Sequence, residues 1–169
     1  MNAVAGAVVF TDIVGFTEFT AVQGDEEAVR LLEVQDALVR KALPDEARIV
    51  KNLGDGFLLW FPDACTALQT CLDLQEEFEV VATDPAQPLW VRMGLHWGCP
   101  KARGDDLVGH DVNVAARIVS VAGPGEVLLS AAACEQIGER ADGVALDELG
   151  PVVMKGIPEP VRLFRAQRA

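Results

Sequence analysis

A chain of 169 residues is near the usual size of one domain, and 50% of its residues are hydrophobic while 24% are charged. This composition excludes a disordered, collagen-like or coiled-coil chain, and it predicts one packed domain over residues 1–169 without a fused regulatory module. Lys and Arg number 14 against 26 Asp and Glu, so the net charge of −12 disfavours nucleic acid and anionic lipid surfaces as partners. A small anionic ligand would need a local reversal of this field.

Neither a membrane span nor a signal peptide is predicted. No stretch approaches the roughly 18 to 20 uninterrupted apolar residues that a span requires. The apolar residues 3–10 have no Lys or Arg before them, so they indicate a strand instead of a signal sequence. The four cysteines show neither C-x-x-C spacing nor His partners at metal-binding spacing. We therefore expect reduced thiols and a cytoplasmic protein.

Apolar periodicity and turn residues predict a mixed succession of strands and helices. In chain order, the expected elements are a strand (3–11), a helix (25–43), strands (48–51 and 57–61), a helix (64–78), a strand (89–98), a helix (111–121), a strand (126–129), a helix (130–137) and strands (144–149 and 161–165). The first six give the order β-α-β-β-α-β. This order predicts an α+β fold with a ferredoxin-like βαββαβ core, an antiparallel sheet with helices on one face, followed by additional C-terminal strands and helices.

Two aspartates are candidates for cation binding. Asp12 ends the first strand just before a Gly-containing helix start, and Asp55 lies between two glycines in the predicted hairpin. Taken alone, Asp12 also fits a helix cap and Asp55 fits turn chemistry. In the predicted sheet, however, the first strand lies beside the hairpin, so the two carboxylates converge although 43 positions separate them. Divalent cations would relieve their repulsion, and the pair predicts a metal and nucleotide site.

A second group of candidates is polar or basic. Asn113 and Arg117 stand four positions apart on a predicted helix, so both project from one face and can hold a ribose or a phosphate. Lys51 offers hydrogen-bond donors and Asp106 offers acceptors. Each of these residues also fits an ordinary solvated surface position when it is considered by itself.

Together, these segments resemble the class III nucleotidyl cyclase catalytic domain, the family of adenylyl and guanylyl cyclases. The resemblance runs from about Val8 to Phe164. It is carried by the segments Phe10-Thr11-Asp12-Ile13-Val14-Gly15-Phe16-Thr17, Lys51-Asn52-Leu53-Gly54-Asp55-Gly56, Arg92-Met93-Gly94-Leu95-His96-Trp97-Gly98, Gly109 with Val112 to Arg117, and Met154-Lys155-Gly156.

The resemblance implies a role for each matching residue. Asp12 and Asp55 would bind two Mg²⁺ or Mn²⁺ ions, of which one activates the ribose 3′-hydroxyl and the other holds the triphosphate. Backbone groups of Gly15, Phe16 and Thr17 would approach the phosphates. The remaining roles are base reading by Lys51 and Asp106, ribose orientation by Asn113, charge stabilisation at the α-phosphate by Arg117 and binding of the outer phosphates by Lys155.

The expected substrate is ATP. Adenine presents an acceptor at N1 and a donor at its 6-amino group, so Lys51 can donate while Asp106 accepts, whereas guanine reverses this pattern. Similar cyclases that select GTP tend to carry Glu where Lys51 stands and a small residue where Asp106 stands. The position of Asp106 rests on counting seven residues back from Asn113, and the neighbouring Asp105 is its competitor.

In this family the site lies between two domains, and this chain holds the residues of both halves. A head-to-tail homodimer with two shared active sites is therefore implied, with residues 119–133 either reaching across the dimer or forming an internal hairpin and helix. The main alternative is a catalytically silent nucleotide-binding regulatory module of the same fold. Such a module usually lacks a metal Asp or the transition-state Arg, and none is missing here. A cyclic-dinucleotide-forming relative is disfavoured because the chain has no Gly-Gly-Asp-Glu-Phe segment.

Overall fold

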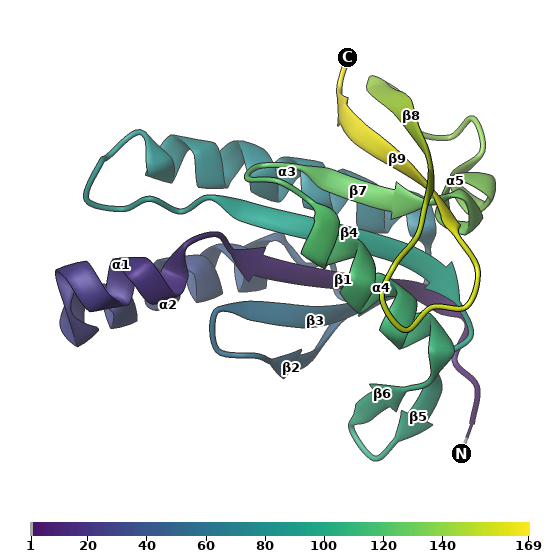
Figure 1. Cartoon of the computed structure of the whole chain (residues 1–169), viewed down its shortest axis with the longest axis horizontal. Helices are drawn as coiled ribbons and strands as arrows, with labels where there is room; N and C mark the ends of the chain where they lie inside the picture. The colour runs from purple at the N-terminus through teal and green to yellow at the C-terminus, as the bar shows by residue number, and fades with distance from the viewer. Residues whose placement is uncertain (1) are drawn as a thin grey trace.

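A seven-stranded sheet runs through the computed structural model, which describes residues 2–169 (Figure 1). The elements in chain order are β1 (Gly6–Ile13), α1 (Phe16–Gln23), α2 (Asp25–Ala42), β2 (Arg48–Asn52), β3 (Gly56–Phe61), α3 (Ala64–Ala82), β4 (Val91–Gly98), β5 (Lys101–Arg103), β6 (Asp106–Val108), α4 (His110–Val121), β7 (Val127–Ser130), α5 (Ala131–Ile137), β8 (Val144–Val152) and β9 (Val161–Arg168). Within residues 2–169, the model contains no helix with the length and apolarity that a membrane crossing demands.

The strand order is β2-β3-β1-β4-β7-β9-β8, which confirms the α+β class and the βαββαβ core. β1 lies antiparallel between β3 and β4, as the predicted convergence of Asp12 and Asp55 requires. The sheet is not wholly antiparallel, however, because β7 pairs in parallel with β4. The crossover from β4 to β7 contains α4, a helical connection of the kind that parallel neighbours need.

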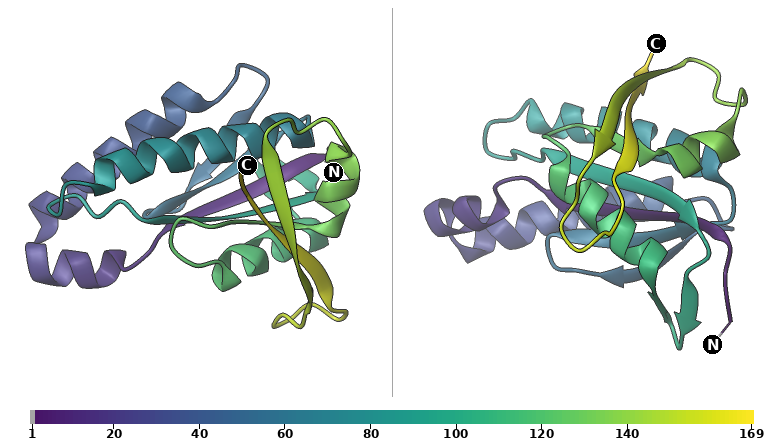
Figure 2. Two further views of the ribbon diagram at one scale, coloured as in Figure 1. Left: turned by 90° about the horizontal axis from the view of Figure 1, so that it is seen from above. Right: turned by 45° about the vertical axis from the view of Figure 1, so that its right-hand side comes forward.

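Helices cover both faces of the sheet. The core helices α2 and α3 lie on one face, as expected, and α4, one of the additional C-terminal elements, lies on the other. One face carries the main core, in which Val9 and Leu59 pack with α2, α3 and α5. On the other face, Val8 and Leu58 pack against Ala115 of α4. Figure 2 shows α4 on the opposite side of the sheet from α2 and α3. Consecutive apolar residues in β1 reflect this two-sided burial, because a strand covered on both faces loses its polar alternation.

Most predicted elements are present with small shifts of their ends. β1 extends to Ile13, so Asp12 lies inside the strand instead of after it. The hairpin of β5 and β6 was not expected, and it projects from the body of the protein in Figure 1. Residues 119–133 contain the end of α4, strand β7 and the start of α5. Within one chain the segment therefore belongs to the sheet and its covering helices, and a contact of these residues with a second subunit stays a prediction.

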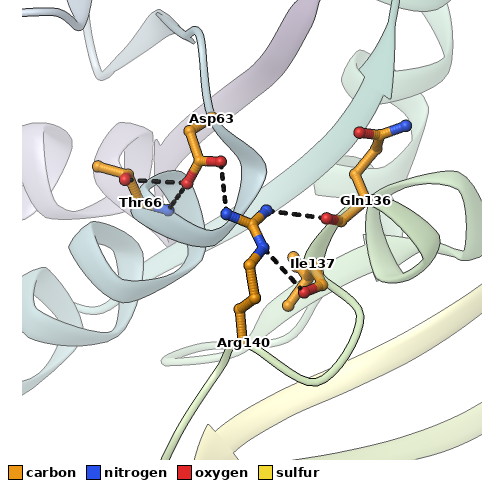
Figure 3. A network of polar contacts seen from close by, with 5 residues as sticks. All are labelled: Asp63, Thr66, Gln136, Ile137 and Arg140. Atoms are coloured by element: carbon orange, nitrogen blue, oxygen red, sulfur yellow. Dashed lines mark hydrogen bonds and ion pairs between the residues drawn. The ribbon is translucent and has the colours of Figure 1, made fainter.

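Asp63 is the N-cap of α3 and is part of a larger polar network (Figure 3). Asp63 Oδ2 accepts hydrogen bonds from Thr66 N at 2.8 Å and from Thr66 Oγ1 at 3.0 Å. Its other oxygen, Oδ1, accepts from Arg140 Nη1 at 2.9 Å. Arg140 also donates to the carbonyl oxygens of Gln136 and Ile137 at the end of α5. One arginine thus connects the start of α3 to the end of α5.

Candidate active site

Asp12 and Asp55 are brought together by the pairing of β1 with the β2–β3 hairpin. Asp12 lies opposite Gly56 in the ladder, and Ile13 N donates to the carbonyl oxygen of Asp55 at 2.9 Å. Gly56 makes this approach possible, because a Cβ atom there would lie 1.8 Å from the carbonyl oxygen of Thr11. The predicted convergence of the two aspartates is therefore present in the structure.

The two carboxyl groups lie close enough to influence each other's ionisation. Burial raises the pKa of Asp55 above its ordinary value, and the negative charge of Asp12 raises it further. A bound cation would favour the ionised forms and so offset both effects. The donor set of two close carboxylates fits a divalent cation.

Arg92 of β4 is a further residue of this site, and the sequence analysis gave it no role of its own. It lies directly opposite Asp12 in the β1–β4 ladder. Its Nη2 and Nε atoms lie 2.7 Å and 2.9 Å from Asp12 Oδ2, and its Nη1 donates to the carbonyl oxygen of Ser120 in α4 at 3.2 Å. The position of an arginine across the ladder from the first aspartate was the signal that could have identified it.

The donor set fits a divalent cation that is completed by substrate. Within residues 2–169, no group of three or more His, Cys, Asp or Glu side chains is arranged to hold a metal ion. Asp12 and Asp55 alone supply carboxylate oxygens here. Mg²⁺ is commonly bound by one or two carboxylates together with substrate phosphates and water, and Mn²⁺ accepts the same hard oxygen ligands. Two adjacent aspartates therefore suffice only when a phosphate-bearing ligand is present.

The helix start beside Asp12 offers donors for such a phosphate. Gly15 has φ 73° and caps α1 without a side-chain hydrogen bond to the first turn. The N–H groups at Phe16 and Thr17 belong to the first turn of a helix, where intrahelical acceptors are absent. Positive φ at Gly15 turns the chain from β1 into α1. The three residues thus lie where the sequence analysis expected a phosphate contact.

Lys51 and Asp106 form an ion pair on the same chain, although 55 positions separate them. Lys51 Nζ lies 3.0 Å from Asp106 Oδ1 and 3.1 Å from Oδ2. The hydrogen bond from Lys51 lowers the pKa of Asp106, which is therefore ionised at neutral pH. Asp105 contributes only its carbonyl oxygen, to Arg48 Nη1 at 3.4 Å. Of the two competing aspartates, Asp106 is the one whose carboxylate contacts Lys51.

Asn113, Arg117 and Lys155 line a common cavity of about 450 Å³ together with Ala116, Gly156 and Ile157. The first two project from α4 four residues apart, and Lys155 lies in the connection between β8 and β9. This cavity brings together the predicted ribose-orienting, charge-stabilising and phosphate-binding residues. In residues 2–169, no hydrogen bond or ion pair joins any of these three side chains to Asp12 or Asp55.

The comparisons with known proteins identify the family of the chain. The family model for the adenylate and guanylate cyclase catalytic domain matches residues 3–165. A pH-sensitive adenylate cyclase of Mycobacterium tuberculosis is 37% identical over 163 residues, which cover 95% of this chain and 40% of the relative. An adenylate cyclase of Streptomyces coelicolor is 34% identical over 140 residues, which cover 82% of this chain and 36% of the relative. The chain thus spans well under half the length of these two relatives.

Solved structures show the same fold. A structure described as an adenylate cyclase from Trypanosoma brucei in its monomeric state superposes with a TM-score of 0.84 and 26% identity, covering 96% of this chain and 89% of that one. The adenylyl cyclase CyaB of P. aeruginosa, at 22% identity and a TM-score of 0.83, covers 100% of this chain and 96% of that one, and it supports the fold alone. With a family model matched over residues 3–165 and relatives above 30% identity, this chain belongs to the adenylate and guanylate cyclase catalytic domain family.

Proposed function

We propose that this chain cyclises ATP to 3′,5′-cyclic AMP and releases pyrophosphate, and that residues 1–169 form one catalytic domain. The observation that carries the proposal is the juxtaposition of Asp12 and Asp55 beside the Gly15 helix start. This geometry offers two carboxylates and free N–H groups to a metal-bound triphosphate. The names of the M. tuberculosis and S. coelicolor relatives support the same reaction.

The Lys51–Asp106 pair supports ATP over GTP. Its two ends lie 3.0 Å apart and present a donor and an acceptor side by side. Adenine needs a donor for N1 and an acceptor for its 6-amino group. Lys51 supplies the donor and Asp106 the acceptor. Guanine would place its own donor against Lys51 and its own acceptor against Asp106. The mismatch leaves polar groups unpaired, which is an effective way to reject a substrate.

The reaction requires orientation and charge neutralisation. The ribose 3′-oxygen forms a bond to the α-phosphorus, the bond to the bridging oxygen of the β-phosphate breaks, and the hydroxyl proton leaves to water. Two Mg²⁺ or Mn²⁺ ions would supply positive charge to the triphosphate and favour ionisation of the 3′-hydroxyl. Asn113 orients the ribose, and Arg117 meets the negative charge that develops at the α-phosphate.

Basic side chains and backbone N–H groups of the chain bind the phosphates in this proposal. Lys155 pairs with the outer phosphates, and the N–H groups that follow Gly15 bind oxygens of the same group. Arg92 forms an ion pair with Asp12. A guanidinium at this position could also contact a phosphate oxygen, because Arg binds carboxylates and phosphates in the same bidentate way.

The active form in this proposal is a head-to-tail homodimer with two equivalent sites. One subunit contributes Asp12 and Asp55, and the other contributes Lys51, Asp106, Asn113, Arg117 and Lys155. The division is supported by the cavity that Asn113, Arg117 and Lys155 line, which includes neither Asp12 nor Asp55. An isologous arrangement then builds each site twice.

We infer the cellular compartment from the free cysteines and from the proposed substrate. Cys65, Cys71, Cys99 and Cys134 are all free in the described part of the chain. Free thiols and ATP are both typical of the cytoplasm, where we place the protein. Nucleic acid and membrane surfaces are not proposed as partners.

Incubation with ATP and, separately, GTP, each with Mg²⁺ or Mn²⁺, tests the proposed function. Products are identified by chromatography and mass spectrometry. We expect 3′,5′-cyclic AMP and pyrophosphate in equal amounts, with much less cyclic GMP from GTP. A preparation shown to be folded and dimeric that yields no cyclic nucleotide with either metal contradicts the proposal.

A further inference from the structure

The first turn of α4 is attached to the end of β4 through Asp111. One carboxylate oxygen, Oδ1, lies 2.9 Å from His96 Nε2, and the other accepts from Cys99 N at 2.8 Å. The fit is tight on the side of Gly98, since a Cβ atom there would lie 2.1 Å from Asp111 Cγ. Burial raises the pKa of Asp111, but the bonds from Cys99 and His96 outweigh it and hold the pKa below its ordinary value. The anchoring group is therefore a carboxylate.

His96 is itself fixed on both sides of its ring. It is only 8% exposed, and its Nδ1 lies 2.7 Å from Ser130 Oγ. A carboxylate can only accept, so Nε2 carries the proton toward Asp111 and Nδ1 accepts from the Ser130 hydroxyl. Ser130 in turn accepts from Ala133 N at 3.2 Å. The chain of contacts connects α4, β4 and the start of α5, and it leaves no polar atom of the His96 ring unpaired.

The same helix is attached to β4 at two more points. Gly94 lets the α4 backbone come close, because a Cβ atom there would lie 2.5 Å from Val119 N. Near the other end of α4, the Ser120 carbonyl oxygen accepts from Arg92. Three residues of one strand, at alternate positions 92, 94 and 96, therefore contact the end, the last turns and the start of α4. An apolar contact would permit the helix to slide, whereas hydrogen bonds at both ends define its position along the sheet.

We propose that His96 and Asp111 are positioning residues for catalysis, which fix the start of α4 so that Asn113 and Arg117 are held at the ribose and the α-phosphate. This inference rests on the proposed function. Asn113 follows Asp111 by two residues and Arg117 by six, so a shift of the first turn moves both. Lys51 and Asp106 lie outside α4, so binding of the base should not depend on the contact.

The test compares His96→Leu and Asp111→Ala with the wild-type chain. In both variants kcat should fall by roughly tenfold to a hundredfold, because displacements of about 1 Å at a reacting group have effects of this size. KM for ATP should stay within about twofold. His96→Gln should recover most of kcat, since its side-chain amide can donate to Asp111 as Nε2 does. The His96→Leu, Asp111→Ala double variant should be no worse than the poorer single variant, as expected for one shared contact.

A matched control separates positioning from loss of stability. Asp63→Ala removes the α3 N-cap and the Arg140 contact, which are remote from α4, and it should lower the melting temperature without changing kcat. The inference is wrong if kcat of His96→Leu or Asp111→Ala stays at the wild-type value. It is also wrong if the fall in kcat of these variants is explained by their loss of folded protein alone. The Asp63→Ala control shows how large that effect is.

Amide hydrogen exchange tests the contact without any reference to activity. Exchange over residues 110–117 should be faster in both variants than in the wild type, with α2 and α3 unchanged. If His96→Leu does not fold, Asp111→Ala alone decides, because Asp111 is partly exposed and its removal leaves no buried cavity. A wild-type chain that makes no cyclic nucleotide contradicts the proposed function, while unchanged exchange over residues 110–117 contradicts the positioning role.

Discussion

The carboxyl group of Asp55 carries a free-energy cost that a bound cation would remove. Burial and the charge of Asp12 both disfavour its ionised form. Asp55→Asn removes this charge with little change of shape. We therefore expect the metal-free variant to melt about 1 to 3 °C higher than the wild type. Mn²⁺ with a non-hydrolysable ATP analogue should then raise the melting temperature of the wild type much more than that of the variant.

The same substitution should lower cyclic AMP formation by at least about a hundredfold, since it removes a proposed metal ligand. Asp45→Asn makes the same chemical change at an exposed position outside the site and is the matched control. It should alter neither the melting temperature nor the activity. Equal turnover by Asp55→Asn and the wild type would contradict the two-metal assignment.

The proposed function places base selection at the Lys51–Asp106 pair. Replacing Lys51 by Glu and Asp106 by Gly reverses the polarity offered to the base, so the ratio of kcat/KM for ATP to that for GTP should fall by at least about tenfold. The measurement is steady-state kinetics with both nucleotides. Asp105→Ala should leave the ratio unchanged, because the Asp105 carboxylate has no contact with Lys51. A fall of the ratio in Asp105→Ala and not in Asp106→Ala would transfer the base-reading role to Asp105.

At the scale of elements, the His96 contact predicts a pH dependence of stability. Burial lowers the pKa of His96 below its ordinary value of 6.5. The unfolded chain therefore binds a proton at His96 more readily than the folded chain does. Its contribution to stability is fully present above about pH 6.5 and is lost as the pH falls through the folded-state pKa. The ionised aspartates with lowered pKa values, Asp63, Asp106 and Asp111, lose their contributions only below about pH 4.

Urea unfolding at pH 7.5 and pH 5.5 checks this prediction. The wild-type free energy of unfolding should fall across this interval, and His96→Gln should reduce the fall because glutamine does not titrate. His110→Gln is the control, since His110 lies on the surface at the start of α4. If the pH dependence of the free energy of unfolding remains in His96→Gln and disappears in His110→Gln, the effect belongs to His110 and this prediction is wrong.

The order of elements could be predicted because each carries a local signal. Pro44 follows the end of α2, Asp63 caps α3, and the glycines around Asp55 form the hairpin turn. The parallel pairing of β4 with β7 could not be predicted, because it depends on the position at which the chain re-enters the sheet after α4. The β5–β6 hairpin was missed because its strands are three residues each, too short for a period to be read.

The candidate site, too, could be predicted only in part. Asp12 and Asp55 were predicted to converge from topology, and the structure places them side by side. The Lys51–Asp106 contact and the cavity shared by Asn113, Arg117 and Lys155 link residues far apart in sequence. Their association could be expected only from the family resemblance. Arg92 was missed because its role depends on cross-strand register, which a single sequence does not display.

For the whole molecule, charge and symmetry impose a common requirement. The chain has a net charge of −12, yet its proposed substrate is a triphosphate. Lys51, Arg92, Arg117 and Lys155, four of the 14 Lys and Arg residues, belong to the proposed site. In the proposed head-to-tail dimer, Lys51, Arg117 and Lys155 of one subunit meet the metal carboxylates of the other, where Arg92 already pairs with Asp12. The local reversal of the field is then complete only when two chains associate.

Complementation between inactive variants tests this shared site most directly. Asp12→Ala and Arg117→Ala chains are mixed, subunit exchange is verified by mass spectrometry, and cyclic AMP is measured. Heterodimers place both lesions in one site and none in the other, so activity should recover to about a quarter of wild type after random exchange. A mixture of Asp12→Ala with Asp55→Ala should stay inactive, because each site then contains one lesion. An exchanged Asp12→Ala and Arg117→Ala mixture that remains as inactive as its components would show that the site lies within one chain.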